Sequence, residues 1–393
     1  MSAPRILLVS NGFGEMAILA SIARAIAARE PAAQLAHLPL VGNPPADAWP
    51  PTVGPRAAMP SGGLVTYWNL RNVIRDVRAG LLGLSLAQFS FLRRQRSAFD
   101  AAIAVGDIYC LAVCLWFLRL PVLFVATAKS EHVATHGPFE LAIARRACAT
   151  FARDAATAQA LVRAGVRARY AGNAMMDGVA RPELDLPRDP NAIVVALLPG
   201  SRADAATNVR DAARRLVLVA QQTGRRVQAF LALAPTVAAG DLTAALAAEQ
   251  FDVSKTQAAV GIVASARRKG AELLLVRGGL AAALCAADVV LGQSGTGNEQ
   301  AAGLGKPVVA AAGPGESPNS VGWYRMRQQR LLGDALAIFP SDDAAYAREL
   351  MALLSDPERM RRMADAGRER MGAPGASDAI AAAALELIRR RCA

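Results

Sequence analysis

The chain has 393 residues, of which 53% are hydrophobic and 5% aromatic, and it carries a formal net charge of +12. The apolar content excludes an intrinsically disordered chain, and the length allows two ordinary domains. The positive charge favours anionic partners such as phosphates or an acidic membrane surface, whereas the absence of a basic–aromatic recognition motif argues against nucleic acid.

Cysteine usage and the apolar segments indicate a cytoplasmic protein. No Cys-x-x-Cys pair occurs among the five cysteines, and the three histidines are not spaced with cysteine for zinc, so we expect no metal site and a reduced compartment. The most apolar stretch, Ala101 to Ala128, is interrupted by Asp107, Arg119 and Pro121. It therefore predicts a strand, a helix and a strand in a core rather than a membrane span.

The first 180 residues alternate short apolar runs with helical patterns, such as Met16–Ala28 and Ala155–Ala164. This alternation predicts a parallel sheet covered by helices. The candidate strands are Ile6–Ser10, Ala101–Val105, Val122–Ala126, Ala149–Ala152 and Ala168–Ala171.

A glycine-containing loop, Ser10 to Glu15, links the first predicted strand to the first helix. It resembles a dinucleotide-binding loop but lacks the third glycine, so the pattern alone is weak. Gly12 and Gly14 would let the backbone approach a ligand, and with Asn11 they are candidates for acceptor binding. Glu15 lies at a helix start, where a carboxylate either stabilises the helix or serves the site.

The next two segments differ in character. Pro39 to Gly63 contains seven prolines and predicts a long irregular loop. Leu64 to Phe99 predicts amphipathic helix with an apolar stripe beside a row of arginines. The stripe fits either a core helix with a solvated basic edge or a patch that rests on an anionic membrane and collects a lipid. The apolar positions are Leu70, Val73, Ile74, Val77 and Leu81, and the arginines are Arg71, Arg75 and Arg78.

The proline-containing segment 181–191 predicts a linker between an N-terminal domain, 1–180, and a second domain, 192–375. In the second domain the strand–helix alternation restarts, so we expect a second parallel sheet. The C-terminal segment, 376–393, is predicted to form a helix. Candidate strands of the second domain are Ala192–Leu197, Arg226–Leu231, Ala259–Ala264, Leu273–Val276, Val289–Leu291, Val308–Ala311 and Leu336–Phe339.

Two turns in the second domain have the character of phosphate cradles. Each follows an apolar strand and opens a helix, so each presents backbone N–H groups and a positive helix end to an anion. Two such turns favour a ligand that bears a diphosphate, and a nucleotide sugar in particular. The candidate residues are Gly200, Ser201 and Arg202 in the first turn, and Ser294, Gly295, Thr296, Gly297, Asn298, Glu299 and Gln300 in the second. Helix capping is the alternative for both turns.

These motifs resemble lipid-A-disaccharide synthase, and most closely its divergent related group. The resemblance rests on Leu197 to Arg202, Ala287 to Leu291, Ser294 to Thr296 and Gly305 to Val309, with Phe151 to Asn173 before the linker. It covers most of the chain from Ala101 onward. It implies an α/β protein of GT-B architecture, in which two Rossmann-like domains with parallel sheets face each other across a cleft.

The resemblance also implies a function. The second domain would bind a UDP-sugar as the donor substrate, the first would bind the acceptor, and the C-terminal helix would pack back on the first. No cofactor or metal is implied, so Arg202 and the helix N-termini would stabilise the departing diphosphate. We expect a lipid acceptor and a peripheral location on the inner face of the cytoplasmic membrane.

Three positions depart from the family's pattern. The family's ribose-binding Glu falls at Gln300, with Glu299 one residue earlier, so either could bind the ribose. The family's catalytic Asp matches Asp107, without its second nearby Asp, and the family's Gly-His is Gly172-Asn173. The acceptor therefore need not be the family's usual acyl-glucosamine phosphate.

We expect Asp107 to act as the general base in an inverting transfer, with Glu15 and His132 as reserve candidates. Asp107 also fits a helix cap for Ile108–Leu118. Two other hypotheses remain open. One is a UDP-sugar 2-epimerase, which needs no lipid acceptor. The other is a catalytically inactive protein that binds a nucleotide sugar or a lipid.

Overall fold

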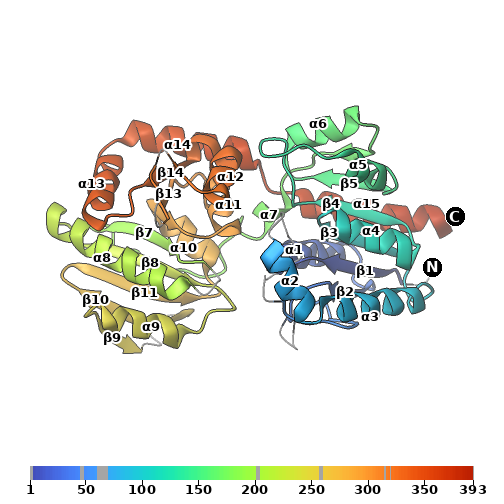
Figure 1. The fold of residues 1–393 in the computed structure, drawn as a ribbon, viewed down its shortest axis with the longest axis horizontal. Coiled ribbons are helices and arrows are strands. Elements are labelled where there is room, and N and C mark those ends of the chain that lie inside the picture. Colours follow the sequence, from blue (N-terminus) through green and yellow to red (C-terminus); the bar gives the residue numbers. More distant parts are fainter. Residues whose placement is uncertain are drawn as a thin grey trace. The chain divides into compact units, whose positions relative to one another are not determined.

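The computed structural model describes residues 3–44, 48–59, 70–200, 204–255, 260–313, 316–318 and 320–392. The chain forms two compact units, each an α/β sandwich (Figure 1). The first unit combines Met1–Gly178 with Pro374–Ala393, and the second is Val179–Ala373. The predicted linker, residues 181–191, has neither helix nor strand and belongs to the second unit, where the carbonyl of Pro187 accepts a 2.8 Å hydrogen bond from Gln228.

The first unit contains a six-stranded parallel sheet in the order β2-β1-β3-β4-β5-β6. Its central strands read as apolar runs because both faces of the sheet are covered, and every residue from Ile6 to Val9 is fully buried. The strands are β1 (Arg5–Ser10), β2 (Gln34–Pro39), β3 (Ala101–Gly106), β4 (Val122–Ala126), β5 (Ala149–Ala152) and β6 (Ala168–Arg169).

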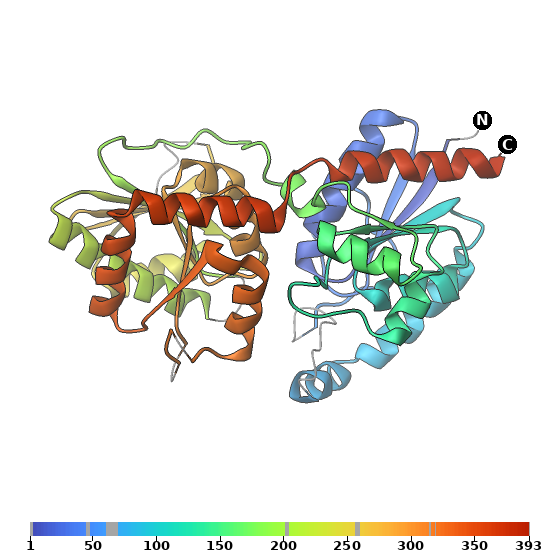
Figure 2. The ribbon, with the colours of Figure 1, turned by 90° about the horizontal axis from the view of Figure 1, so that it is seen from above.

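Helices cover both faces of this sheet. On one face, α1 (Phe13–Arg29) contacts α7 (Ala174–Asp177) and the C-terminal helix α15 (Ala376–Cys392). The opposite face carries α3 (Leu81–Arg94), α4 (Ile108–Val113), the π-helical segment η1 (Cys114–Leu118) and α5 (Pro138–Ala144), and Figure 2 shows the two layers on either side of the strands. The remaining helices are α2 (Leu70–Arg78), which contacts α3, and α6 (Ala155–Arg163).

The second unit contains an eight-stranded sheet in the order β14-β13-β12-β7-β8-β11-β10-β9. The six strands from β14 to β11 are parallel, and β10 and β9 add an antiparallel edge. The strands are β7 (Ile193–Leu198), β8 (Val227–Leu233), β9 (Asp252–Lys255), β10 (Ile262–Arg268), β11 (Ala271–Arg277), β12 (Val289–Gly292), β13 (Val308–Ala311) and β14 (Leu336–Phe339).

Two helical layers cover this sheet as well. One layer holds α8 (Ala205–Thr223), α9 (Ala239–Ala248) and α13 (Asp343–Leu354), and α8 contacts the other two. The other holds α10 (Leu280–Ala286), α11 (Thr296–Gly303), α12 (Trp323–Leu332) and α14 (Pro357–Met371), with the 3₁₀ turn η2 (Gly333–Ala335). Among the described residues, no helix has the length and apolarity needed to cross a bilayer.

The predicted fold class is confirmed, with one departure and two missed strands. The departure is the antiparallel hairpin of β9 and β10, where we predicted only parallel strands. The sequence patterns did not indicate β9 or β2 as strands. β9 is an edge strand of four mostly exposed residues, and β2 contains Gln34 and His37, so neither has the apolar run of a central strand.

Candidate functional site

Both candidate phosphate turns lie at one place in the second unit. The chain continues from β7 to β8 on one side, whereas β12 pairs with β7 on the other. The carboxyl ends of β7 and β12 therefore form the point where the strand order reverses, which is where open α/β sheets bind ligands. Gly200 follows the end of β7, and Ser294 follows the end of β12.

The backbones of the two turns are in contact. The N–H of Gln293 donates a 2.8 Å hydrogen bond to the carbonyl of Leu198. Gly200 has φ +92°, a conformation that favours glycine, and a Cβ there would lie 3.4 Å from the Gln293 carbonyl oxygen. The sequence predicted the two turns separately, and the sheet brings them together.

The second turn opens α11. Ser294 Oγ accepts a 3.2 Å hydrogen bond from the N–H of Gly297, although the N-cap of α11 is the next residue, Gly295. A hydroxyl that accepts one bond still has its own proton to donate. Ser294, Gly295 and Thr296 are half-buried, and they lie at the start of a helix whose positive dipole end suits an anion. The N–H groups of Asn298 and Glu299 already donate to the Gly295 carbonyl at 3.1 and 3.3 Å.

Two buried amides hold this turn in place. Asn298 is fully buried, and its Nδ2 donates to the carbonyl of Gly292 at 3.2 Å. Gln328, on α12, is also buried and donates to the carbonyl of Ser294 at 2.8 Å. The Asn298 side chain thus supports the turn from within, and its predicted contact with the ligand stays a prediction.

The other predicted donor-site residues differ in accessibility. Glu299 is half-buried, whereas Gln300 is buried, so Glu299 presents the more accessible oxygen pair. Ser201 and Arg202 lie outside the described residues.

The sequence patterns gave no indication of the side chains that α12 brings to this turn. The hydroxyl of Tyr324 lies 2.9 Å from the position that a Cβ on Gly295 would occupy. Glu316 accepts from the N–H of Gly313 at 2.8 Å and from Arg325 Nε at 3.2 Å, and these donors lower its pKa. An uninterrupted helical pattern over Trp323–Leu332 was the available signal, but which of its faces meets α11 depends on tertiary packing.

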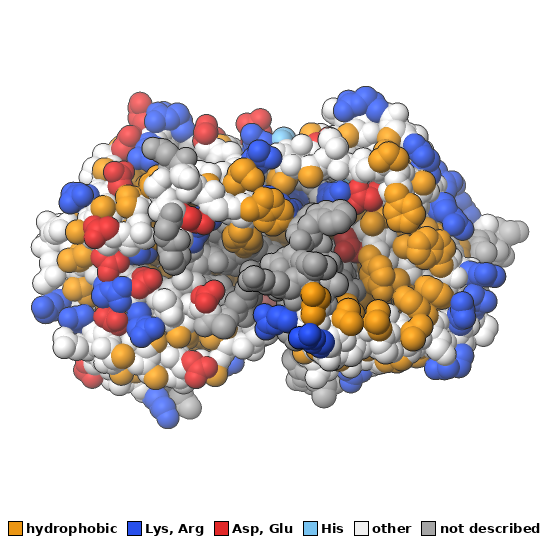
Figure 3. Space-filling view, viewed as in Figure 1, with side chains coloured by type: hydrophobic (Ala, Val, Ile, Leu, Met, Phe, Trp, Pro, Cys, Tyr) orange, Lys and Arg blue, Asp and Glu red, His pale blue; other side chains and the backbone are white. Residues whose placement is uncertain are grey.

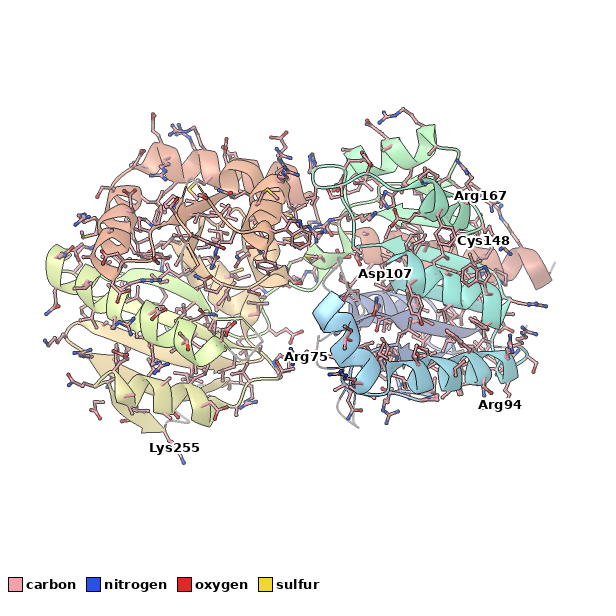
Figure 4. All side chains as sticks on the ribbon, viewed as in Figure 1. Arg75, Arg94, Asp107, Cys148, Arg167 and Lys255 are labelled. Carbon is pink, nitrogen blue, oxygen red and sulfur yellow. The ribbon has the colours of Figure 1, made fainter. Side chains whose placement is uncertain are left out.

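The first unit has an equivalent reversal point between β1 and β3, where Asn11 and Asp107 follow the strand ends. Asn11 Nδ2 donates a 2.9 Å hydrogen bond to Asp107 Oδ2. The other oxygen, Oδ1, accepts from the N–H of Cys110 at 3.0 Å, so Asp107 is also the predicted cap of the following helix. Figure 4 labels Asp107 at this end of the sheet.

Of the remaining predicted residues of this unit, Glu15, Gly12 and Gly14 follow β1, whereas His132 follows β4. Glu15 lies near the end of β3, because a Cβ on Gly106 would be 3.6 Å from Glu15 Cγ. Gly12 has φ +120° and precedes α1, and Gly14 lies within that helix. His132, by contrast, lies in the loop after β4 and is not among the hydrogen-bond partners of Asp107.

Burial dominates the electrostatics of Asp107. It raises the pKa of the carboxyl group, while the hydrogen bonds from the Cys110 amide and Asn11 act in the opposite direction. Asn11 is 1% exposed, so its amide positions Asp107 rather than meeting solvent. Within the described part of the chain, no group of three or more His, Cys, Asp or Glu side chains could hold a metal ion.

No protein-family model matches the sequence, and no curated protein matches it significantly. Solved structures are similar over nearly the whole chain. MurG of Acinetobacter baumannii is 12% identical with a TM-score of 0.55, covering 98% of this chain and 99% of its own. A UDP-glucosyltransferase of Polygonum tinctorium, capable of glucosylating indoxyl, has the same values. The UDP-GlcNAc 2-epimerase of Neisseria meningitidis bound to UDP-GlcNAc is 13% identical with a TM-score of 0.54, covering 97% of this chain and 100% of its own.

These similarities establish the fold. The chain has the two parallel-sheet α/β units of GT-B proteins, and the similar structures include both glycosyltransferases and UDP-sugar epimerases. The resemblance to lipid-A-disaccharide synthase in particular stays a prediction, as do the roles of the individual site residues.

Proposed function

We propose that this protein is a metal-independent, inverting glycosyltransferase that transfers a sugar from a UDP-sugar to a lipid or lipid-linked acceptor. An N-acetylglucosamine-type donor is our first choice. The observation that carries the proposal is the meeting of two small-residue turns at the reversal point of the second sheet, with the Gln293 N–H bonded to the Leu198 carbonyl at 2.8 Å. A diphosphate needs several N–H donors within a small volume, and two adjoining turns supply them.

Two parts of the donor, the diphosphate and the ribose, have candidate groups in this unit. The positive end of α11, the N–H groups of Gly295 and Thr296 and the Ser294 hydroxyl would bind the diphosphate, because the N–H groups that follow are already bonded within the turn. Arg202 would add a guanidinium that can contact two phosphate oxygens. Glu299 is favoured over Gln300 for the ribose hydroxyls because it is less buried and its carboxylate accepts with both oxygens.

Asp107 is the proposed general base. A carboxylate whose pKa is raised by burial binds a proton more readily than one in water. In the transfer, the acceptor hydroxyl loses its proton to Asp107 and its oxygen forms a bond to C1 of the sugar. The bond between C1 and the diphosphate oxygen breaks, and UDP leaves with the electron pair.

Two experiments test the proposal in sequence. Titration calorimetry should give saturable binding of UDP and of UDP-sugars, with no requirement for a divalent cation. Incubation with radiolabelled UDP-sugars and a membrane lipid extract should then give labelled lipid. A protein that binds no uridine, guanosine or adenosine diphosphate would contradict the proposal at its first step.

A UDP-sugar 2-epimerase is the second candidate, because the meningococcal epimerase shares this fold over its full length. The same incubation separates the two activities. An altered sugar that remains attached to UDP, formed without any lipid, would favour epimerisation. Binding without conversion would indicate an inactive nucleotide-sugar-binding protein.

A further inference from the structure

Helices α2 and α3 of the first unit each bury one polar side chain and expose two large apolar ones. In α2, Asp76 is fully buried while Ile74 and Val77 are exposed. In α3, Gln88 is 1% exposed and donates to the carbonyls of Leu40 at 2.9 Å and Pro55 at 3.1 Å. An amphipathic helix that only packs on a core buries its apolar side chains. In α3, Leu92 does lie in the core, so the core-helix interpretation accounts for part of the apolar residues and leaves the exposed ones unexplained.

The exposed apolar side chains continue from α2 across α3 to η1. Leu82 and Leu86 are 61% and 68% exposed, and Trp116 on η1 is 42% exposed. Phe89 of α3 stacks on Phe117 of η1 with ring centroids 4.0 Å apart, so the two elements form one surface. We call Ile74, Val77, Leu82, Leu86 and Trp116 the apolar face. Figure 3 shows hydrophobic side chains gathered over this unit, with Lys and Arg at their margin.

The charge around the apolar face is positive. Residues 70–120 contain seven arginines and three aspartates, with no lysine or glutamate. Asp76 is buried, Asp100 pairs with Arg5 at 2.8 Å, and Asp107 caps α4. Five of the arginines are exposed in contrast, namely Arg75, Arg78, Arg93, Arg94 and Arg119, whereas Arg96 is half-buried. Figure 4 labels Arg75 on α2 and Arg94 at the end of α3.

From this combination we infer that the apolar face docks the protein on an anionic lipid bilayer, with α2 and α3 lying in the interface. Leucine side chains enter the acyl boundary, Trp116 lies at headgroup level, and the arginines attract anionic headgroups. The inference deepens the proposed function, on which it rests for its biological purpose, by naming the surface through which a lipid acceptor is reached.

A bilayer fits this surface better than a folded partner does. The arginines surround the exposed leucines, and an anionic bilayer presents negative headgroups on all sides of an inserted apolar group. Insertion of leucine into a bilayer also requires no pocket of complementary shape, as a folded partner would. A second copy of the chain would instead place one arginine-rich margin against another, which is repulsive.

Vesicle cosedimentation without nucleotide tests the inference. The probes are vesicles of phosphatidylcholine alone and vesicles with about one-third phosphatidylglycerol, chosen for its negative charge. Leu82→Ser/Leu86→Ser should lower the partition coefficient on anionic vesicles by roughly tenfold or more. The matched control, Val162→Ser/Val260→Ser, removes two exposed valines elsewhere and should change nothing.

A second pair of variants tests the charge. Arg75→Gln/Arg78→Gln should abolish most of the preference for anionic vesicles, again by roughly tenfold, whereas Arg361→Gln/Arg362→Gln on α14 should preserve it. Equal binding to both vesicle types, or no binding, would overturn the inference. So would a dimer in analytical ultracentrifugation that the leucine variant dissociates, because the occupant would then be a second copy.

The vesicle experiments do not depend on whether the protein transfers a sugar. Asp107→Asn should bind vesicles as the unsubstituted protein does, since Asp107 lies at a strand end rather than on the apolar face. Vesicle binding by a protein that transfers no sugar would leave this inference intact and contradict only the proposed function.

Discussion

Asn11 Nδ2 and Asp107 Oδ2 are 2.9 Å apart, although 96 positions separate the residues in the chain. The bond joins the loops after β1 and β3 at the reversal point of the first sheet. The donated proton orients the carboxylate, and the Cys110 amide fixes its other oxygen at 3.0 Å. The carboxylate is thus held from two sides in a buried setting, as a positioned base requires.

Replacing Asp107 by Asn should lower turnover by about a hundredfold or more while leaving the Kd for UDP-sugar nearly unchanged. Asparagine is also a good helix cap, so the substitution removes the base without removing the cap. Steady-state kinetics and calorimetry give the two quantities. Asp154→Asn is the matched control, because Asp154 caps α6 through a 2.7 Å bond from the Thr157 amide. Turnover that falls equally in both variants would assign Asp107 a structural role alone.

His37 should make the fold sensitive to acid. Its Nε2 lies 2.8 Å from Ser10 Oγ, and burial lowers its pKa from 6.5 to about 4. The neutral ring is therefore favoured in the fold, and its contribution to stability is complete above pH 6.5 and is lost as pH falls toward 4. The difference between the two pKa values corresponds to about 3 kcal/mol in the free energy of unfolding.

Urea denaturation of the unsubstituted protein, of His37→Gln and of His132→Gln at pH 7 and pH 4.5 measures this contribution. The loss of unfolding free energy on acidification should be smaller in His37→Gln than in the unsubstituted protein, and His132→Gln is the control substitution of another histidine. An identical loss in all three proteins would show that His37 does not set the acid sensitivity.

Gly292→Ala should disturb the donor turn. A Cβ at this position would overlap the buried Asn298 side chain, so either the amide or the strand end must move. We expect a loss of about 1–3 kcal/mol in stability and weaker UDP binding. Gly240→Ala is the control, since nothing lies within 4 Å of its added Cβ and alanine favours the helix. A Gly292→Ala protein with unaltered melting temperature and UDP affinity would refute this tight packing.

Gln328→Leu should weaken nucleotide binding without touching the nucleotide. The substitution removes the 2.8 Å bond to the Ser294 carbonyl and leaves that acceptor unsatisfied, at a cost of about 1–3 kcal/mol. The neighbouring Gln329→Leu should have little effect, because Gln329 is only half-buried. The Kd for UDP of each variant is measured by calorimetry. Equal affinities of Gln328→Leu and Gln329→Leu would show that the turn is rigid without Gln328.

The sequence alone determined the layered α/β fold, because each central strand is an apolar run and each strand end carries its own turn residues. The Ser294–Thr296 turn, the cap at Asp107 and most strands of both sheets follow from such local patterns. Propensity, capping and periodicity act over a few residues, so they are legible in a single segment.

Only the tertiary structure decided which of these segments meet. The contacts between Asn11 and Asp107, between Gln293 and Leu198, and between Gln328 and Ser294 depend on strand order and helix packing. The tertiary structure also turned Leu82 and Leu86 outward while burying Gln88, although the sequence fitted either orientation of the helix. Long-range pairing is a property of the whole packed chain, and a local pattern limits the possible partners without selecting one.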